Sequence, residues 1–241
     1  MSGLIRLPKI LGAMQPYLFP YLGYFSLLAH VDEYVILDDV QMITRGWINR
    51  NNVLLGGKAH RFTIRLTNSS QSLMICQVGV GDDFRAFRAM LTSGYAKAPY
   101  FKQTMALIED VIGCEDRNLA RFTEHSIRLL AEYLGIDTPI IQSSMLGIAP
   151  ELRAQDRIIE ICLQRRASHY INPIGGMGLY SKVAFDEHGI ALDFIRYVPV
   201  PYEQGTSEFI PNLSIIDALM FTGPISTRAL VDSYDLAETA V

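Results

Sequence analysis

Residues 10–38, ILGAMQPYLFPYLGYFSLLAHVDEYVILD, contain the pattern that indicates the fold. The apolar run Ile10–Met14 predicts a strand, Leu22–His30 a short helix and Tyr34–Asp38 a second strand. A strand–loop–helix–strand unit of this length is typical of two parallel strands joined by a right-handed crossover. The sequence therefore predicts an α/β protein whose parallel-sheet core is of the Rossmann-like or nucleotidyltransferase-like type.

The rest of the chain adds a hairpin-rich insertion, a helical middle and a helical C-terminal part. Three short strands are expected in the insertion, with Gly56-Gly57 as the hairpin turn: Asn51–Leu55, Arg61–Leu66 and Met74–Val78. The helices predicted from apolar spacing are Phe84–Ser93, Gln103–Ile112, Arg117–Leu134 and Gln155–Arg166. The further predicted strands are Pro139–Ser143, His169–Asn172 and Ala191–Tyr197.

The C-terminal part is expected to open with a capping box. Ser214-Ile-Ile-Asp217 predicts the start of a helix that runs to Phe221, where Gly223-Pro224 would end it. We expect a single domain, 1–241, which has three parts: an α/β core at 8–50 plus 138–200, a helical segment at 84–135 and a helical C-terminal segment at 212–235.

Composition narrows the class of protein further. The 241 residues are 49% apolar and only 19% charged, with a net charge of −4, so a folded core is expected and sequence-blind nucleic-acid binding is not. The 22 residues Ile10–Val31 carry no formal charge, but Pro16 and Pro20 would break a membrane-spanning helix or a secretory signal. We therefore expect no membrane span and a cytoplasmic protein with reduced cysteines.

The loop after the first predicted strand is the first candidate site. Tyr17–Phe25 holds five aromatic residues, and a loop between a parallel strand and its helix is where open α/β sheets bind ligands. Gln15, Tyr17 and Tyr24 carry polar groups and are predicted to bind substrate. The alternative is that these aromatic rings only fill the core and the prolines only shape the turn.

The segment that follows the second predicted strand is the second candidate site. Asp38 and Asp39 end that strand, and because neighbouring strand residues point to opposite faces, at most one is expected to face a shared pocket. Either could be a general base, a metal ligand or a partner of a nearby arginine. The predicted substrate-binding residues downstream are Arg45, Trp47, Asn49, Arg50 and Asn51.

The chemistry of this segment suits a small polar ligand. Arg45 and Arg50 could clamp a phosphate or carboxylate, and Trp47, the single tryptophan, could stack on a sugar or a base. The alternative is a solvated loop with internal salt bridges. Asn172 begins a turn, Asn172-Pro-Ile-Gly-Gly176, that could present backbone N–H groups to an anion. Neither a nucleotide-binding glycine motif nor metal-ligand spacing of histidines is evident.

These two segments resemble the WbqC-like protein family. The resemblance lies in Gln15–Phe25, Asp38–Gln41 and Arg45–Asn51, and continues in Tyr95–Phe101, Tyr170–Gly175 with Leu179-Tyr180, and Leu213–Asp217 with Gly223. One departure is Arg61–Arg65, where the family tends to have a tryptophan-containing stretch. The resemblance implies a role in O-antigen or other surface-polysaccharide biosynthesis, as a transferase that places a glycyl, other aminoacyl or acyl group on a sugar.

We therefore expect a small-molecule transferase with Asp38 or Asp39 as its catalytic residue. Its substrate could be a nucleotide-linked sugar, and its donor an activated acyl or aminoacyl compound; no metal is indicated. One alternative is a nucleotidyltransferase-like enzyme, although Tyr21 and Tyr24 stand where such enzymes have histidines. The other alternative is a non-catalytic ligand-binding or assembly protein whose aromatic loop is an interface.

Overall fold

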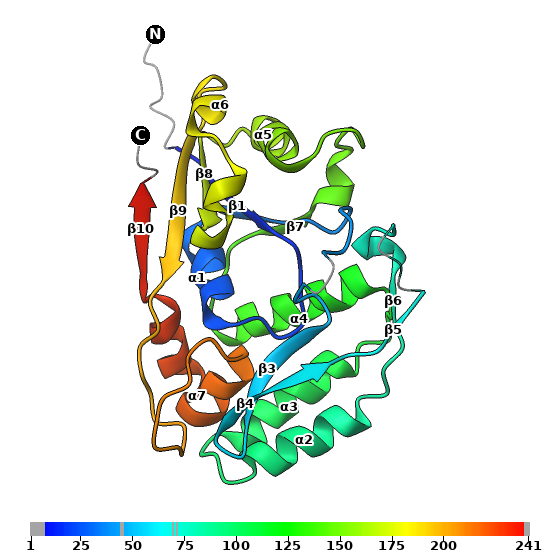
Figure 1. The fold of residues 1–241 in the computed structure, drawn as a ribbon, viewed down its shortest axis with the longest axis vertical. Coiled ribbons are helices and arrows are strands. Elements are labelled where there is room, and N and C mark those ends of the chain that lie inside the picture. Colours follow the sequence, from blue (N-terminus) through cyan, green and yellow to red (C-terminus); the bar gives the residue numbers. More distant parts are fainter. Residues whose placement is uncertain (1–7, 44–45, 69, 71, 239–241) are drawn as a thin grey trace.

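The fold is a mixed α/β structure built on a mostly parallel central sheet (Figure 1). We describe it from a computed structural model, which covers residues 8–43, 46–68, 70 and 72–238. The sheet has six strands in the order β10-β9-β8-β1-β2-β7. Their bounds are β1 Ile10–Met14, β2 Glu33–Ile36, β7 Ile140–Gln142, β8 His169–Pro173, β9 Ala191–Tyr197 and β10 Tyr234–Glu238.

Five of these strands are parallel, and their order explains where ligands can bind. Counted along the chain, β7-β2-β1-β8-β9 has the order 3-2-1-4-5, so the connections reverse direction between β1 and β8. Doubly wound sheets have this order, and their ligands bind beyond the carboxyl ends of the strands at such a reversal. The parallel core predicted from residues 10–38 is confirmed, because β1 pairs with β2 in parallel register.

Helices cover both faces of the sheet. On one face lies α1 (Leu22–His30), and an added Cβ on Gly12 of β1 would meet Leu27 of this helix at 3.1 Å. On the other face, Leu11 and Ala13 pack into a core with α5 (Ala154–Arg165) and α6 (Lys182–Asp186). Alternate residues of β1 therefore pack into the cores on opposite faces of the sheet, because side chains alternate along a strand.

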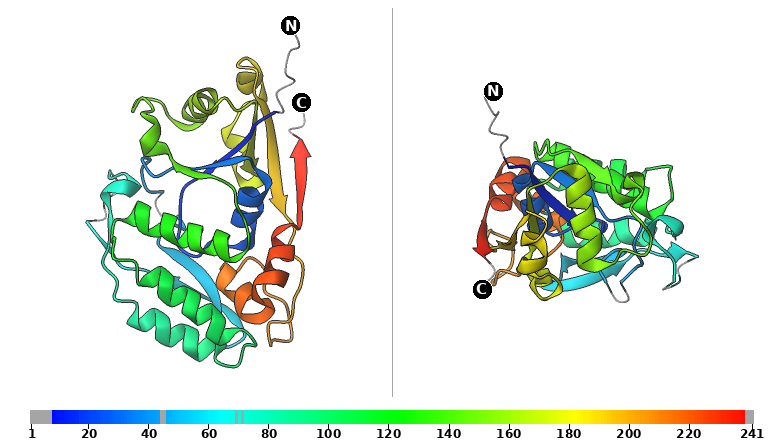
Figure 2. Two further views of the ribbon diagram at one scale, coloured as in Figure 1. Left: turned by 180° about the vertical axis from the view of Figure 1, so that it is seen from behind. Right: turned by 90° about the horizontal axis from the view of Figure 1, so that it is seen from above.

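A second layer of helices extends the core on the α1 side, as Figure 2 shows from two further directions. It comprises α2 (Arg85–Tyr95), α3 (Phe101–Ile112), α4 (Leu119–Tyr133) and α7 (Ile215–Val231), which share one hydrophobic core with α1. A two-stranded hairpin, β3 (Arg50–Leu55) with β4 (Lys58–Thr63), packs against this layer. The short strands β5 (Leu66–Thr67) and β6 (Gly79–Val80) pair with each other.

Three sequence expectations need correction. Residues 74–78 do not form a strand: Ile75–Gln77 is a 3₁₀ turn, η1, in which the Gln77 side chain accepts the Met74 N–H. Gly223 (φ 69°, ψ 178°) kinks α7, but the helix resumes and continues to Val231. The C-terminal part is not wholly helical, since β10 joins the sheet antiparallel to β9. Two further 3₁₀ turns are η2 (Ser143–Leu146) and η3 (Ile174–Leu179).

Within the part of the chain that the structure describes, no helix has the length and apolar character needed to cross a membrane.

Candidate functional site

Two cavities open at the carboxyl ends of the parallel strands, one on each side of β1. Met14 lines the first and the next residue, Gln15, lines the second, because successive residues leave the strand on opposite faces. We call them the aromatic cavity and the Asp39 cavity. Their volumes are about 500 Å³ and about 420 Å³, within the range usual for small-molecule sites.

The aromatic cavity lies at the β1/β8 reversal of the sheet. It is lined by the carboxyl ends of β1, β8 and β9, the loop after β1, the start of β3 with the segment before it, the start of η3 and the segment before α7: Met14, Tyr17, Tyr21, Trp47, Asn51, Pro173, Ile174, Gly175, Ile195, Arg196, Tyr197 and Asn212. Tyr21 packs edge-on against Tyr197, and Trp47 is 48% exposed, with the Arg61 guanidinium 5.9 Å from its ring centroid. Such a wall offers ring faces to a sugar or a planar heterocycle.

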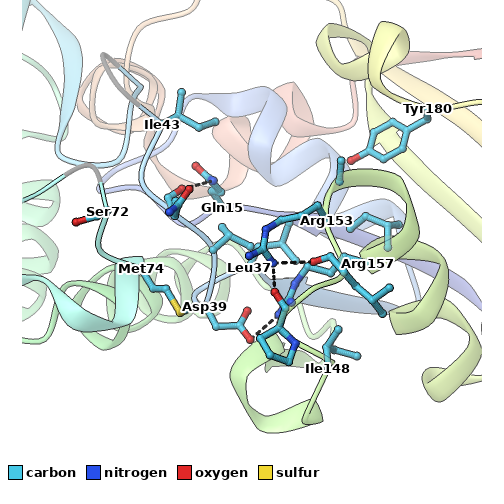
Figure 3. Close-up of a pocket in the computed structure, with 16 residues that line it drawn as sticks. Gln15, Leu37, Asp39, Ile43, Ser72, Met74, Ile148, Arg153, Arg157 and Tyr180 are labelled. Atoms are coloured by element: carbon cyan, nitrogen blue, oxygen red, sulfur yellow. Dashed lines mark hydrogen bonds and ion pairs between the residues drawn. The ribbon is translucent and has the colours of Figure 1, made fainter.

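The Asp39 cavity lies on the α5 side of β1 and is lined by more charged residues than the aromatic cavity (Figure 3). It is lined by the loop after β2, the segment before η1 and the first turn of α5: Gln15, Leu37, Asp39, Val40, Gln41, Ile43, Ser72, Met74, Ile148, Pro150, Leu152, Arg153, Ala154, Arg157, Ile158 and Tyr180. Asp39 is the one carboxylate among the described residues that line the two cavities.

Asp39 is held by two partners. Arg157 Nη2 donates to Asp39 Oδ2 at 2.5 Å, and the Ser143 hydroxyl donates to Oδ1. The Arg157 side chain is only 6% exposed and that of Asp39 is 18% exposed, so the pair is largely withdrawn from water. A charge-assisted hydrogen bond of this kind fixes the carboxylate in one orientation while one edge still faces the cavity.

Asp38 has a different environment from its neighbour. Its buried carboxylate accepts hydrogen bonds from the Ser144 backbone N–H (3.0 Å), the Ser144 hydroxyl (2.6 Å) and the Ser143 hydroxyl (3.2 Å). These bonds connect the end of β2 to η2, which follows β7 directly. Asp38 lines neither of these two cavities, whereas Asp39 lines the second.

The predicted substrate-binding residues divide between the two cavities. Gln15 lines the Asp39 cavity and donates from Nε2 to the Gln41 carbonyl at 3.2 Å. Tyr17, Trp47 and Asn51 line the aromatic cavity instead. Asn51 also supports the loop after β1, because its amide donates to the Phe19 carbonyl at 2.6 Å. Among the described residues, Asp39 therefore shares its cavity with Gln15 of the loop after β1 but not with the tyrosines of that loop.

The remaining predicted site residues have structural partners. Tyr24 is fully buried, edge-on to Tyr17 with ring centroids 5.2 Å apart. Asn49 donates to the Ile64 carbonyl at 2.8 Å, and Arg50 Nε donates to the Gly46 carbonyl at 2.5 Å. Asn172 accepts from the Tyr170 hydroxyl at 3.0 Å. None of these four residues lines either cavity, and Arg45 lies outside the described residues.

Sequence reasoning missed the arginines that the structure places in the cavities. Arg153 and Arg157 stand at the start of α5, and Arg196 lies in β9. The sequence did contain an indication of Arg153 and Arg157. A predicted helix follows the predicted strand at 139–143, and in a parallel sheet the start of such a helix lies at the carboxyl edge, where ligands bind. Nothing in the sequence alone could show that Arg157 meets Asp39, 118 positions earlier.

Burial raises the pKa of the tyrosines around the aromatic cavity. The pKa of Tyr17 is raised by burial and by the neighbouring Tyr21 and Tyr24, and burial also raises the pKa of Tyr21. Burial and the neighbouring Tyr21 raise the pKa of Tyr197 to about 12. These phenols therefore stay neutral at physiological pH and can act as hydrogen-bond donors or ring platforms rather than as bases. Across the described ranges no three His, Cys, Asp or Glu side chains are grouped as a metal site.

Comparison with known proteins agrees with the motifs around these cavities. The sequence profile of the WbqC-like protein family matches residues 15–229, a span that contains every residue lining either cavity except Met14. The chain belongs to the WbqC-like protein family. A relative within it, the uncharacterized protein Rv1507c of Mycobacterium tuberculosis, is 26% identical over 220 residues, 89% of this chain and 94% of its own length. No solved structure matches this WbqC-like chain.

Proposed function

We propose that this WbqC-like protein is a small-molecule transferase of O-antigen-type surface-polysaccharide or related biosynthesis. In this proposal it transfers an acyl or aminoacyl group, such as glycyl, to an amino sugar, with Asp39 as the general base. The observation that carries the proposal is the placement of Asp39: its carboxylate borders a cavity at the ligand-binding edge of the sheet, and Arg157 keeps it oriented.

The proposed reaction needs one proton acceptor. The amino or hydroxyl group of the acceptor attacks the carbonyl carbon of the activated donor, the new C–N or C–O bond forms, and the bond to the leaving group breaks. The Asp39 carboxylate takes the proton released by the attacking group. The substrates would be oriented by the side-chain amide of Gln15 and by the polar and aromatic side chains of the neighbouring aromatic cavity.

A comparison of metabolites tests this proposal. In a strain that lacks the gene, complementation with the wild-type chain should remove an accumulated unmodified acceptor, whereas Asp39→Asn should leave it accumulated. Asp137→Asn is the matched control, because Asp137 is exposed and lines neither cavity. Melting temperatures of the purified variants separate loss of chemistry from loss of fold. A metabolite profile of the folded Asp39→Asn strain that equals the wild type would contradict the role of Asp39 and favour a non-catalytic ligand-binding protein.

A nucleotide-binding enzyme is the second candidate, and the strand order favours it. Doubly wound sheets bind nucleotides where the strand order reverses, which is the position of the aromatic cavity. Melting curves with ATP and with CTP, each with and without magnesium, distinguish the candidates. A rise in melting temperature with a nucleotide supports this reading, and unchanged melting with both contradicts it.

A further inference from the structure

We propose that the Asp39 cavity holds a phosphoryl group of the substrate between Arg153, Arg157 and the first turn of α5. This inference rests on the proposed function, since it names a chemical feature of the ligand that enters the same cavity. The arginines that bind the anion in this proposal are Arg153 and Arg157, whereas the sequence predicted a phosphate or carboxylate clamp formed by Arg45 and Arg50.

The first turn of α5 faces the cavity and leaves backbone donors unused. Arg153 and Ala154 line the cavity, and the N-cap residue Arg153 has no side-chain cap. Across the described residues, the backbone N–H groups of Ala154 and Gln155 have no hydrogen-bond acceptor. The amino end of a helix carries a partial positive charge and free N–H groups, a combination that binds anions.

Arg157 supplies an independent sign of a missing partner. It is 5% exposed and lines the cavity, and its Nη2 is paired with Asp39. Its Nε atom is buried and has no hydrogen-bond partner among the described residues. A buried guanidinium N–H without an acceptor is destabilising, and an oxygen of a bound anion in the cavity would satisfy it.

The charges around the cavity favour a phosphoryl group. Among the residues that line the cavity, the Asp39 carboxylate offsets the charge of Arg157, which leaves the Arg153 guanidinium as an unbalanced positive charge. Arg153 is held at the cavity rim, since its Nη1 donates to the carbonyls of Leu152 (3.1 Å) and Pro150. A planar guanidinium and the two free backbone N–H groups of Ala154 and Gln155 together match the several acceptor oxygens of a phosphate.

Binding of inorganic pyrophosphate in magnesium-free buffer tests the inference directly by calorimetry. We expect Arg153→Gln to weaken binding by about tenfold, the loss of one charge-assisted hydrogen bond. Arg157→Lys should weaken it by a similar factor, because lysine can keep the ion pair with Asp39 but has no Nε–H. Arg166→Gln is the matched control at the far end of α5, where an exposed arginine is removed at the same change in net charge. We expect the control to change affinity by less than about twofold.

Three results would overturn the inference. The first is no measurable binding of pyrophosphate by the wild-type chain. The second is an equal loss of affinity in Arg153→Gln and Arg166→Gln, which would indicate attraction by net charge alone. The third is tighter binding of citrate than of pyrophosphate, which would assign the cavity to a carboxylate.

The same set of variants separates this inference from the proposed function. Pyrophosphate binding that depends on Arg153, combined with a normal metabolite profile for Asp39→Asn, would retain the phosphoryl site and reject the catalytic role of Asp39. A catalytically inactive Asp39→Asn strain, combined with no pyrophosphate binding, would retain the transferase and reject the phosphoryl site.

Discussion

Asp38 and Asp39 show how one position in a chain separates a structural carboxylate from a candidate catalytic one. Successive residues leave a strand in opposite directions, so the sequence predicts that at most one of these two aspartates faces a pocket. Asp39 borders its cavity, whereas Asp38 is buried and accepts two hydrogen bonds from Ser144, with the Ser143 hydroxyl shared between the two aspartates. What the sequence could not show is which aspartate takes which role.

Replacement of Asp38 should therefore affect stability. We expect Asp38→Ala to lower the free energy of unfolding by about 2–4 kcal/mol, because the Ser144 N–H loses its acceptor and the connection between β2 and η2 is lost. Urea unfolding followed by circular dichroism measures this difference. Asp137→Asn, an exposed position, should stay within about 0.5 kcal/mol of wild type. Equal midpoints for Asp38→Ala and wild type would show that these hydrogen bonds contribute nothing.

Trp47 allows a ligand in the aromatic cavity to be detected without a label. It is the single tryptophan and is half exposed, so all tryptophan fluorescence comes from the cavity wall. If a sugar ring or base stacks there, titration with UDP-N-acetylglucosamine, a nucleotide-linked amino sugar, should change the emission intensity. Trp47→Ala should weaken the binding measured by calorimetry by about tenfold and change stability by less than about 0.5 kcal/mol. Unaltered emission throughout the titration would argue against stacking of such a sugar on Trp47.

At the scale of single elements, local patterns predicted the regular core well. The predicted helix Leu22–His30 and the predicted strands Ile10–Met14 and Ala191–Tyr197 have the bounds found in the structure. The segment Met74–Val78 reads as a strand by composition but forms η1, because Ile75 and Cys76 donate their N–H groups to Val40 and Asp38. Partners distant in sequence, which no local pattern encodes, determine that turn.

Gly223 interrupts the last helix where the sequence predicted its end, but the helix then continues to Val231. Its left-handed φ of 69° interrupts the helix at the place where the sequence predicted a stop. An added Cβ would lie 2.6 Å from the Tyr100 ring, so the kink also allows the start of α3 to approach. The helix resumes after Pro224, because proline is well tolerated in the first turn of a helix.

Gly23 provides a test of how α1 is seated on the sheet. An added Cβ on Gly23 would lie 2.7 Å from Cβ of Tyr197 in β9 and 2.5 Å from the Tyr21 ring. Gly23→Ala should therefore cost about 1–3 kcal/mol by overpacking, in spite of the better helix propensity of alanine. Thermal melting checks this, with Gly178→Ala as a control where an added Cβ meets nothing within 4 Å. Comparable melting of both variants would mean that α1 shifts freely.

At the scale of the whole molecule, the sequence predicted the class of fold but not the composition of the site. It placed the site at the ligand edge of a parallel sheet, where both cavities open. The sequence did not predict that the aromatic residues and Asp39 line two different cavities. That division depends on the side of β1 on which each residue lies in the folded protein. It also did not predict β10, which depends on pairing with β9 in the completed sheet.

A buried hydrogen-bond network joins several elements through residues that line neither of the two cavities. Asp217 of α7 accepts from the hydroxyls of Tyr95 (2.9 Å) and Tyr202 (2.7 Å) and from Gln204 Nε2 (2.7 Å). The Leu54 N–H of β3 donates in turn to the Tyr95 hydroxyl at 2.6 Å. One carboxylate therefore ties together the hairpin, α2, the segment before α7 and α7 itself.

This network predicts a specific dependence of stability on pH. Burial raises the pKa of Asp217, and the hydrogen bonds from Tyr202, Tyr95 and Gln204 lower it only in part, so the net shift is upward. Between the unfolded pKa, about 3.9, and the higher folded pKa, the folded state binds more protons than the unfolded state. The contribution of Asp217 to the free energy of unfolding is therefore greatest below that window and is lost as the pH rises through the folded pKa.

Asp217→Asn removes this titration and so isolates its effect. We expect the variant to be less stable than wild type by about 1–3 kcal/mol at neutral pH, because an amide cannot accept from all three donors. The difference between wild type and variant should then widen as the pH is lowered from 7 toward 4, since only the wild-type chain gains stability from protonation of Asp217. Urea unfolding of both chains across that range measures the difference. A gap that stays constant or narrows toward acid would mean that the hydrogen bonds, and not burial, dominate the pKa of this carboxyl group.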